Sequence, residues 1–362
     1  MNIYIPQHSS QKNKFFKGLY VFVTLLLSLV IIYIIYSSSK TILAENRHDV
    51  DDFYKKLNDG MDVNVLVVGD SIGAGSGATD LSKNWISLLT NALQEKYEVN
   101  CKITNISMGG NTSYAGYVRT MVLKDNVNYD LAIICYGQND REEDFSLYYE
   151  SIIRAIQHKY KKCEIISVLE SSQRNYTTKI QEIQQLCSYY YIPTADTISA
   201  FNNSGIGYEN LTKDGIHPSD EGQEIYSETI KNVISNKLKN NIRIKRNLNP
   251  YNKDVVKFES CKYIGVDELK KVNETTFEIQ LKNITGVLGI DYSFESGDNV
   301  ANIYIDNQLS AAPTVSFNYD FSQRHIIIVN DDCNVNSGIR LEFGSSTQAG
   351  GFRGIIFSNV DN

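Results

Sequence analysis

Four short stretches of the sequence hold side chains that acyl-transfer chemistry uses. They are Gly69–Ile72, Asn105–Thr112, Gly137–Asp140 and Asp214–Pro218. A serine hydroxyl is a poor nucleophile on its own and needs an adjacent base, which in turn needs a carboxylate to orient it. The first stretch contains Ser71, and the last contains an aspartate and a histidine. The sequence therefore predicts a serine nucleophile with its supporting triad.

Histidine is scarce enough to restrict where the base can lie. The five histidines of the chain are His8, His48, His158, His217 and His325. Only His217 falls in a loop at the edge of the predicted α/β region described below. Asp214 stands three residues before it, so its carboxylate can hold one imidazole nitrogen while the other nitrogen faces Ser71.

The oxyanion that develops during acyl transfer needs hydrogen-bond donors. The candidates are the backbone N–H groups of Ser71 and Gly110 and the side-chain amide of Asn139. Each stretch alone also has an ordinary structural interpretation, because Gly, Asp, Asn and Ser are the usual residues of tight turns. The four together favour catalysis, since each supplies a different group that one mechanism needs.

Alternating apolar runs and helical patterns surround these stretches. Strands are predicted at 63–68, 99–106, 131–136, 165–169 and 192–195, and helices at 85–97, 114–124, 145–160, 178–190 and 221–238. Strands that alternate with helices of this length predict a parallel sheet covered on both faces. Function in such sheets lies at the carboxyl ends of the strands, where three of the four stretches begin.

The four stretches resemble, in type, order and position, the four motif blocks of the GDSL/SGNH hydrolase superfamily. The resemblance covers residues from about 63 to 238 and implies a flavodoxin-like three-layer α/β/α domain that works through a covalent acyl-serine, without a cofactor. It implies that Ser71 is the nucleophile, that His217 and Asp214 complete the triad, and that Gly110 and Asn139 are oxyanion donors.

Two departures and one rival interpretation accompany the resemblance. Ile72 replaces the usual leucine, and Ser107 stands where the second block often has another glycine, which leaves Gly109 as an alternative to Gly110. Residues 73–78 also fit the dinucleotide pattern G-x-G-x-x-A. We reject that interpretation because the glycines begin several residues beyond the strand and no acidic residue ends the second strand.

One strongly apolar run precedes the α/β region. Residues 19–36 carry no charge, and a run of this length nearly spans a bilayer. We predict a transmembrane helix at 18–38, with a cleaved signal peptide as the alternative. Lys12, Lys14 and Lys17 place the N-terminus in the cytoplasm and the remainder outside the cell.

The remaining boundaries follow from changes in composition. We predict a cytoplasmic tail at 1–17, a stalk at 39–61, the hydrolase domain at 62–239 and a linker at 240–253. Short alternating runs with turn residues between them then predict a β-sandwich or jelly roll at 254–362, with carbohydrate binding as one interpretation.

Composition excludes several other classes of function. A net charge of −7 argues against nucleic acid as a partner. The six cysteines form no CxxC motif or Cys/His cluster, so no metal is expected. Free thiols are the default, and a Cys261–Cys333 disulfide is the alternative.

These features predict a membrane-anchored serine esterase that removes acyl groups, such as acetyl, from a surface or extracellular glycan. A first alternative is an O-acyltransferase that passes the same acyl group to a sugar hydroxyl. With one membrane span, it would need a membrane partner that donates the acyl group. A second alternative is a non-catalytic glycan-binding protein, against which the complete triad argues.

Overall fold

The computed structural model describes Tyr33 and residues 52–240, 246–294, 301–313 and 323–358. Apart from Tyr33, the predicted membrane span at 18–38 lies outside these residues. Among the described residues, no helix has both the length and the apolar character needed to cross a membrane.

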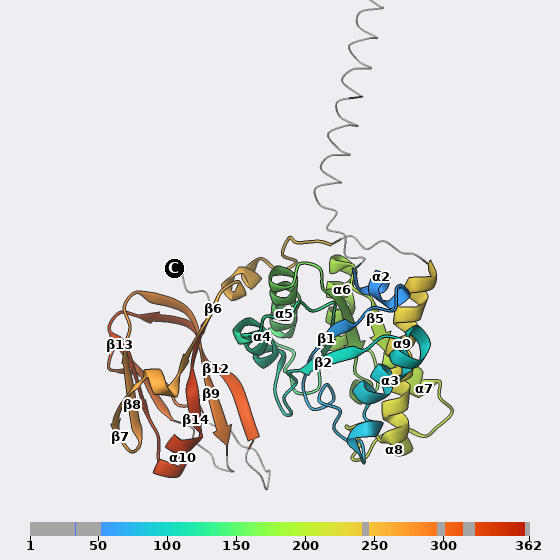
Figure 1. The fold of residues 1–362 in the computed structure, drawn as a ribbon. Helices are drawn as coiled ribbons and strands as arrows, with labels where there is room; N and C mark the ends of the chain where they lie inside the picture. The colour runs from blue at the N-terminus through green and yellow to red at the C-terminus, as the bar shows by residue number, and fades with distance from the viewer. Residues whose placement is uncertain (1–32, 34–51, 241–245, 295–300, 314–322, 359–362) are drawn as a thin grey trace, which may run out of the picture. The chain divides into compact units, whose positions relative to one another are not determined.

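The first half of the described chain forms a parallel sheet with the strand order β2-β1-β3-β4-β5 (Figure 1). This is the order found in flavodoxin-like folds. The strands are β1 (Val63–Gly69), β2 (Cys101–Asn105), β3 (Leu131–Cys135), β4 (Glu164–Leu169) and β5 (Thr194–Asp196). All four neighbouring pairs are parallel, as the alternation of strands and helices predicts.

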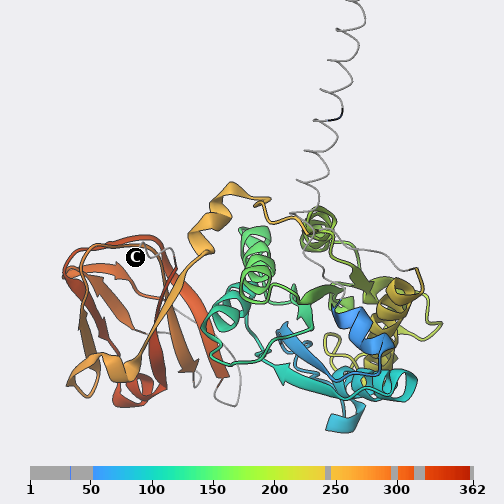
Figure 2. The ribbon, with the colours of Figure 1, turned by 45° about the horizontal axis from the view of Figure 1, so that its top comes forward.

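Helices cover both faces of this sheet (Figures 1 and 2). The longer ones are α3 (Trp85–Tyr97), α4 (Ser113–Val122), α5 (Phe145–Lys159), α6 (Thr178–Tyr190) and α9 (Asp220–Asn240). Successive residues of β1 point to opposite faces, so Leu66 and Val68 join the core beneath α4, α5 and α6. Val65 and Val67 join the core beneath α3 and α9.

Three short helices complete this part of the chain. They are α2 (Asp52–Asn58), α7 (Thr197–Asn202) and α8 (Tyr208–Leu211). Helix α2 lies within the predicted stalk at 39–61, yet its Phe53 and Leu57 are fully buried in the core with Trp85. Residues 52–58 are therefore part of the α/β unit, because two apolar side chains one helical turn apart face the same core.

The second half forms two antiparallel sheets with an apolar core between them (Figure 1). One has the order β11-β10-β13-β8-β7 and the other β12-β9-β14-β6. The strands are β6 (Cys261–Gly265), β7 (Lys270–Asn273), β8 (Thr276–Gln280), β9 (Ile284–Phe294), β10 (Asn302–Ile305), β11 (Gln308–Ala311), β12 (Gln323–Val335), β13 (Gly338–Glu342) and β14 (Phe352–Ser358). Helix α10 (Ser346–Gly351) precedes β14. All six cysteines are free, so the alternative Cys261–Cys333 disulfide is absent.

Candidate active site

The structure brings Ser71, His217 and Asp214 into one hydrogen-bonded chain. His217 Nε2 lies 2.8 Å from Ser71 Oγ, and Nδ1 lies 2.6 Å from Asp214 Oδ2. Burial raises the pKa of Asp214, but hydrogen bonds from His217 and from the Ile216 backbone outweigh it and hold that pKa below its usual range. Asp214 is therefore ionised at neutral pH and can hold the imidazole in the orientation that leaves Nε2 free to accept the serine proton.

A glycine and a buried glutamine hold the serine and histidine loops together. Gly77 has a φ of 100°, and a Cβ there would lie 2.3 Å from Pro218 O and 3.0 Å from His217 Cβ. Gln223 of α9 is fully buried, and its Nε2 donates to Ser76 O at 2.9 Å and to Pro218 O at 3.2 Å. The short distance between base and nucleophile depends on this close approach of the two loops.

The predicted oxyanion donors lie around the same serine. Gly110 has a φ of 69°, and a Cβ on the preceding Gly109 would lie 3.5 Å from Ser71 Cβ. Asn139 Nδ2 donates to Asp70 Oδ2 and to Asn111 O, in both cases at 3.2 Å. Both bonds are long, and an oxyanion beside Ser71 would compete with one of them for an amide hydrogen.

Comparison with known proteins agrees with this geometry. Residues 67–225 match the GDSL-like Lipase/Acylhydrolase family. This part of the chain is a GDSL-type acylhydrolase domain. It contains all five predicted site residues, and the protein is a carboxylic ester hydrolase of the serine type. No curated protein matches the chain by sequence.

Two solved structures are among those similar to the chain. A two-domain esterase active on acetylated mannans, co-crystallized with mannopentaose, is 15% identical with a TM-score of 0.69, covering 87% of this chain and 95% of that chain. An acetylxylan esterase from Geobacillus stearothermophilus is 22% identical with a TM-score of 0.42, covering 49% of this chain and 96% of that chain. The coverage of the first extends well beyond the family match and includes antiparallel strands of the second half.

Buried carboxyl groups lie directly beneath the nucleophile of the GDSL-type domain. Asp70 and Glu170 are both fully buried. Asp70 Oδ1 accepts from Ile72 N at 2.8 Å, and Glu170 Oε2 accepts from Gln138 N at 2.9 Å. Burial is the largest cause that raises the pKa of each. The charge of Asp140 raises the pKa of Asp70 further, and the charges of Asp70 and Asp140 raise that of Glu170. No sequence motif indicates Glu170, because only the fold brings the end of β4 beneath Ser71.

Asn111 connects the GDSL-type domain to strand β12 of the second half. It is 1% exposed, and its Nδ2 donates to Gly109 O and to Arg324 O, in both cases at 2.8 Å. Its Oδ1 accepts from Ile326 N at 3.0 Å. One side chain thus joins the candidate oxyanion turn to the β12 backbone. The side-chain amide of Gln323 covers the same turn, since its nitrogen lies 2.7 Å from the position of a Cβ on Gly110.

We predict that Asn111→Ala lowers kcat for p-nitrophenyl acetate by about tenfold, with a smaller change in KM. The physical reason is that the Gly109–Gly110 turn loses its bonds to β12, so a donor that acts mainly in the transition state is displaced. Steady-state kinetics measures this effect. Asn330→Ala is the control, because Asn330 also lies on β12 but bonds to Ser310 within the second half. Equal kcat values for Asn111→Ala and the control would contradict the positioning role.

We also predict a pH-dependent effect of Glu170→Gln on stability. Because the folded state raises the pKa of the Asp70 and Glu170 carboxyls, it binds more protons than the unfolded state, and the free energy of unfolding falls as the pH rises above about 4. Urea denaturation at a series of pH values should show a smaller fall in Glu170→Gln than in the wild type. The exposed Glu95→Gln should keep the wild-type slope, and an unchanged slope in Glu170→Gln would contradict the prediction.

Proposed function

We propose that this protein is a membrane-anchored, extracytoplasmic esterase that removes acyl groups, most readily acetyl, from a surface or extracellular glycan. The observation that carries the proposal is the hydrogen-bonded chain from Ser71 through His217 to Asp214. Such a chain activates a serine for attack on an ester carbonyl without a cofactor.

The reaction proceeds in two halves through an acyl-serine. In the first, Ser71 Oγ bonds to the ester carbonyl carbon while its proton passes to His217 Nε2. The negative charge on the carbonyl oxygen is then stabilised by the backbone N–H groups of Ser71 and Gly110 and by Asn139 Nδ2. The alcohol leaves with the proton from His217. In the second half, a water molecule repeats these steps and releases the acid.

The proposal that the substrate is an acetylated glycan is supported by the fold and by the activity of a structural neighbour. The two-domain esterase that shares the fold over 87% of this chain acts on acetylated mannans. Glycans outside the cell are also the ester substrates that an enzyme in the predicted location would meet.

The anchor and the location are supported by the sequence. Residues 19–36 are uncharged and long enough to span most of a bilayer, and three lysines precede them. Under the positive-inside rule, this arrangement holds the catalytic part on the outer side of the membrane.

The test of activity compares the full-length wild type with Ser71→Ala on p-nitrophenyl acetate. We expect kcat to fall by about 10⁴-fold or more in the variant, since removing the nucleophile abolishes the covalent route. Ser76→Ala, in the same glycine-rich turn, should keep the wild-type rate. Absence of hydrolysis by the wild type would contradict the proposal. A wild type that forms an acyl-enzyme but turns over only with added sugar would instead be an O-acyltransferase.

The test of location uses cell fractionation with the full-length chain and a chain lacking residues 1–38. We expect the full-length protein to remain in the membrane fraction after a carbonate wash and its catalytic part to be accessible to external protease. The shortened chain should be in the soluble fraction, because the apolar run is the only anchor in the proposal. A full-length protein that carbonate extracts, or a mature N-terminus near residue 40, would contradict the anchor.

A further inference from the structure

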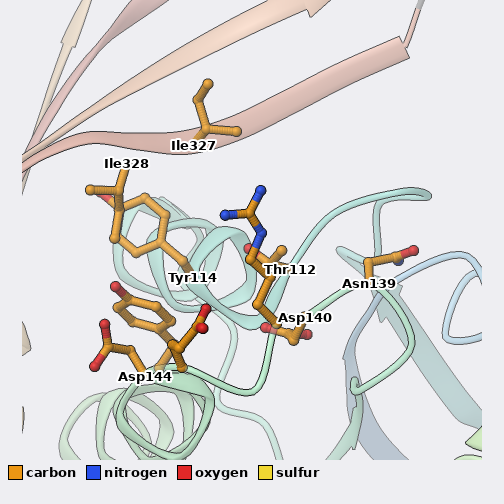
Figure 3. A pocket seen from close by; sticks show the side chains of 10 residues that line it. Thr112, Tyr114, Asn139, Asp140, Asp144, Ile327 and Ile328 are labelled. Carbon is orange, nitrogen blue, oxygen red and sulfur yellow. The ribbon is translucent and has the colours of Figure 1, made fainter. Parts of the chain in front are cut away.

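A pocket of about 340 Å³ adjoins the candidate oxyanion hole. Figure 3 shows Asp140 and Asp144 on one side and Ile327 and Ile328 of β12 on the other. Asn139 lines the same pocket, so a molecule bound here can be continuous with an ester held at Ser71.

The size of the pocket bears on which part of the substrate it holds. Under the proposed function, on which this inference rests, the acyl group is small and needs little space beside Ser71. A volume of 340 Å³ is in the range of pockets that bind whole small molecules. It therefore suits the alcohol part of the ester.

The polarity of the lining excludes a long acyl chain as the natural occupant. Asp140 is 8% exposed, and its buried Oδ2 has no hydrogen-bond partner among the described residues. Asp144 is the N-cap residue of α5, but its side chain makes no capping hydrogen bond. An apolar chain would remove water from the exposed Asp144 carboxylate and leave Asp140 Oδ2 without a hydrogen-bond donor, which is unfavourable. A ligand rich in hydroxyl groups would satisfy them, since ionised carboxylates only accept hydrogen bonds.

The apolar part of the lining completes the chemistry of a sugar site. Tyr148 is half-buried in the pocket and presents both a ring and a hydroxyl. Burial, and then the charges of Asp144, Asp331 and Asp140, raise the pKa of Tyr148 to about 12, so its hydroxyl stays protonated and can donate. A sugar ring has one face of C–H groups and an edge of hydroxyls, and so matches an aromatic ring flanked by carboxylates.

We propose that this pocket binds a sugar ring of the alcohol part of the ester, packed between Tyr148 and the Ile327–Ile328 segment, with Asp140 and Asp144 accepting hydrogen bonds from its hydroxyls. Strand β12 is then a wall of the substrate site. The second half of the chain thereby contributes to the choice of glycan, and the acyl group is recognised separately at Ser71.

The first test is substrate selectivity in the full-length protein. We compare kcat/KM for a chemically acetylated mannopentaose with kcat/KM for p-nitrophenyl acetate in the wild type, Tyr148→Ala and Asp144→Asn. We expect the ratio of the two values to fall at least tenfold in both variants, chiefly through KM for the oligosaccharide. Tyr191→Ala and Asp59→Asn, at exposed positions that do not line this pocket, should keep the wild-type ratio. An unchanged ratio in the two pocket variants would overturn the inference. If the variants instead lost activity only on the long-chain ester p-nitrophenyl decanoate, the pocket would bind the acyl chain, and this result would also overturn it.

The second test does not depend on turnover. Calorimetric titration of the wild type and of Tyr148→Ala with unacetylated mannopentaose, and in parallel with xylopentaose, measures sugar binding directly. We expect at least one oligosaccharide to bind the wild type and to bind the variant at least tenfold more weakly. Failure of both sugars to bind, in a protein that still hydrolyses p-nitrophenyl acetate, would overturn this inference and leave the proposed function intact. Sugar binding without any hydrolysis of p-nitrophenyl acetate would contradict the proposed function and leave sugar binding at this pocket intact.

Discussion

The hydrogen bond of 2.8 Å between Ser71 Oγ and His217 Nε2 joins two loops that are 146 residues apart in the chain. A parallel sheet makes such a bond possible because the carboxyl ends of its strands lie at one edge. Their position at this edge does not by itself hold the Ser71 and His217 loops together. Gly77 allows their backbones to approach, and Gln223 bonds to both of them from α9. The geometry of the site is therefore a property of the packed domain more than of either loop.

The buried carboxyl groups show that the site also carries an electrostatic cost. Burial raises the pKa of both carboxyls, and the charge of Asp70 raises that of Glu170 further, so the pair favours a shared proton over two charges. Both carboxyl groups nevertheless accept hydrogen bonds. Asp70 accepts from Ile72 N and Asn139 Nδ2, and Glu170 accepts from Gln138 N. These bonds orient the backbone after Ser71 and the amide of Asn139. The cost of burial is thus offset by the ordering of groups that face the substrate.

The sequence predicted the residues whose type identifies their chemistry. Scarcity of histidine isolated His217, and the strand-end motifs indicated Ser71 and Asn139 before any fold was known. Glu170, Gln223 and Asn111 were not predicted, because an ordinary glutamate, glutamine or asparagine acquires its role only from tertiary neighbours. Strand β9 has no regular alternation that would indicate it, since Gly286, Gly289 and Asp291 interrupt its apolar residues. Helix α2 was taken for part of a stalk because its two buried apolar residues lie among charged ones.

Strand β12 connects the stability of the second half to the chemistry of the first. It lies at the end of its sheet, and an edge strand presents unpaired N–H and C=O groups that are prone to further pairing. The side-chain amide of Asn111 forms hydrogen bonds with two of these groups, Arg324 O and Ile326 N. The same amide donates to Gly109 O. A side chain from the candidate oxyanion turn thus takes the place of a neighbouring strand. Because the bonds that protect the edge are the bonds that fix the turn, a change in β12 that weakens the edge must also loosen the turn. The second half cannot vary at this strand as an independent module.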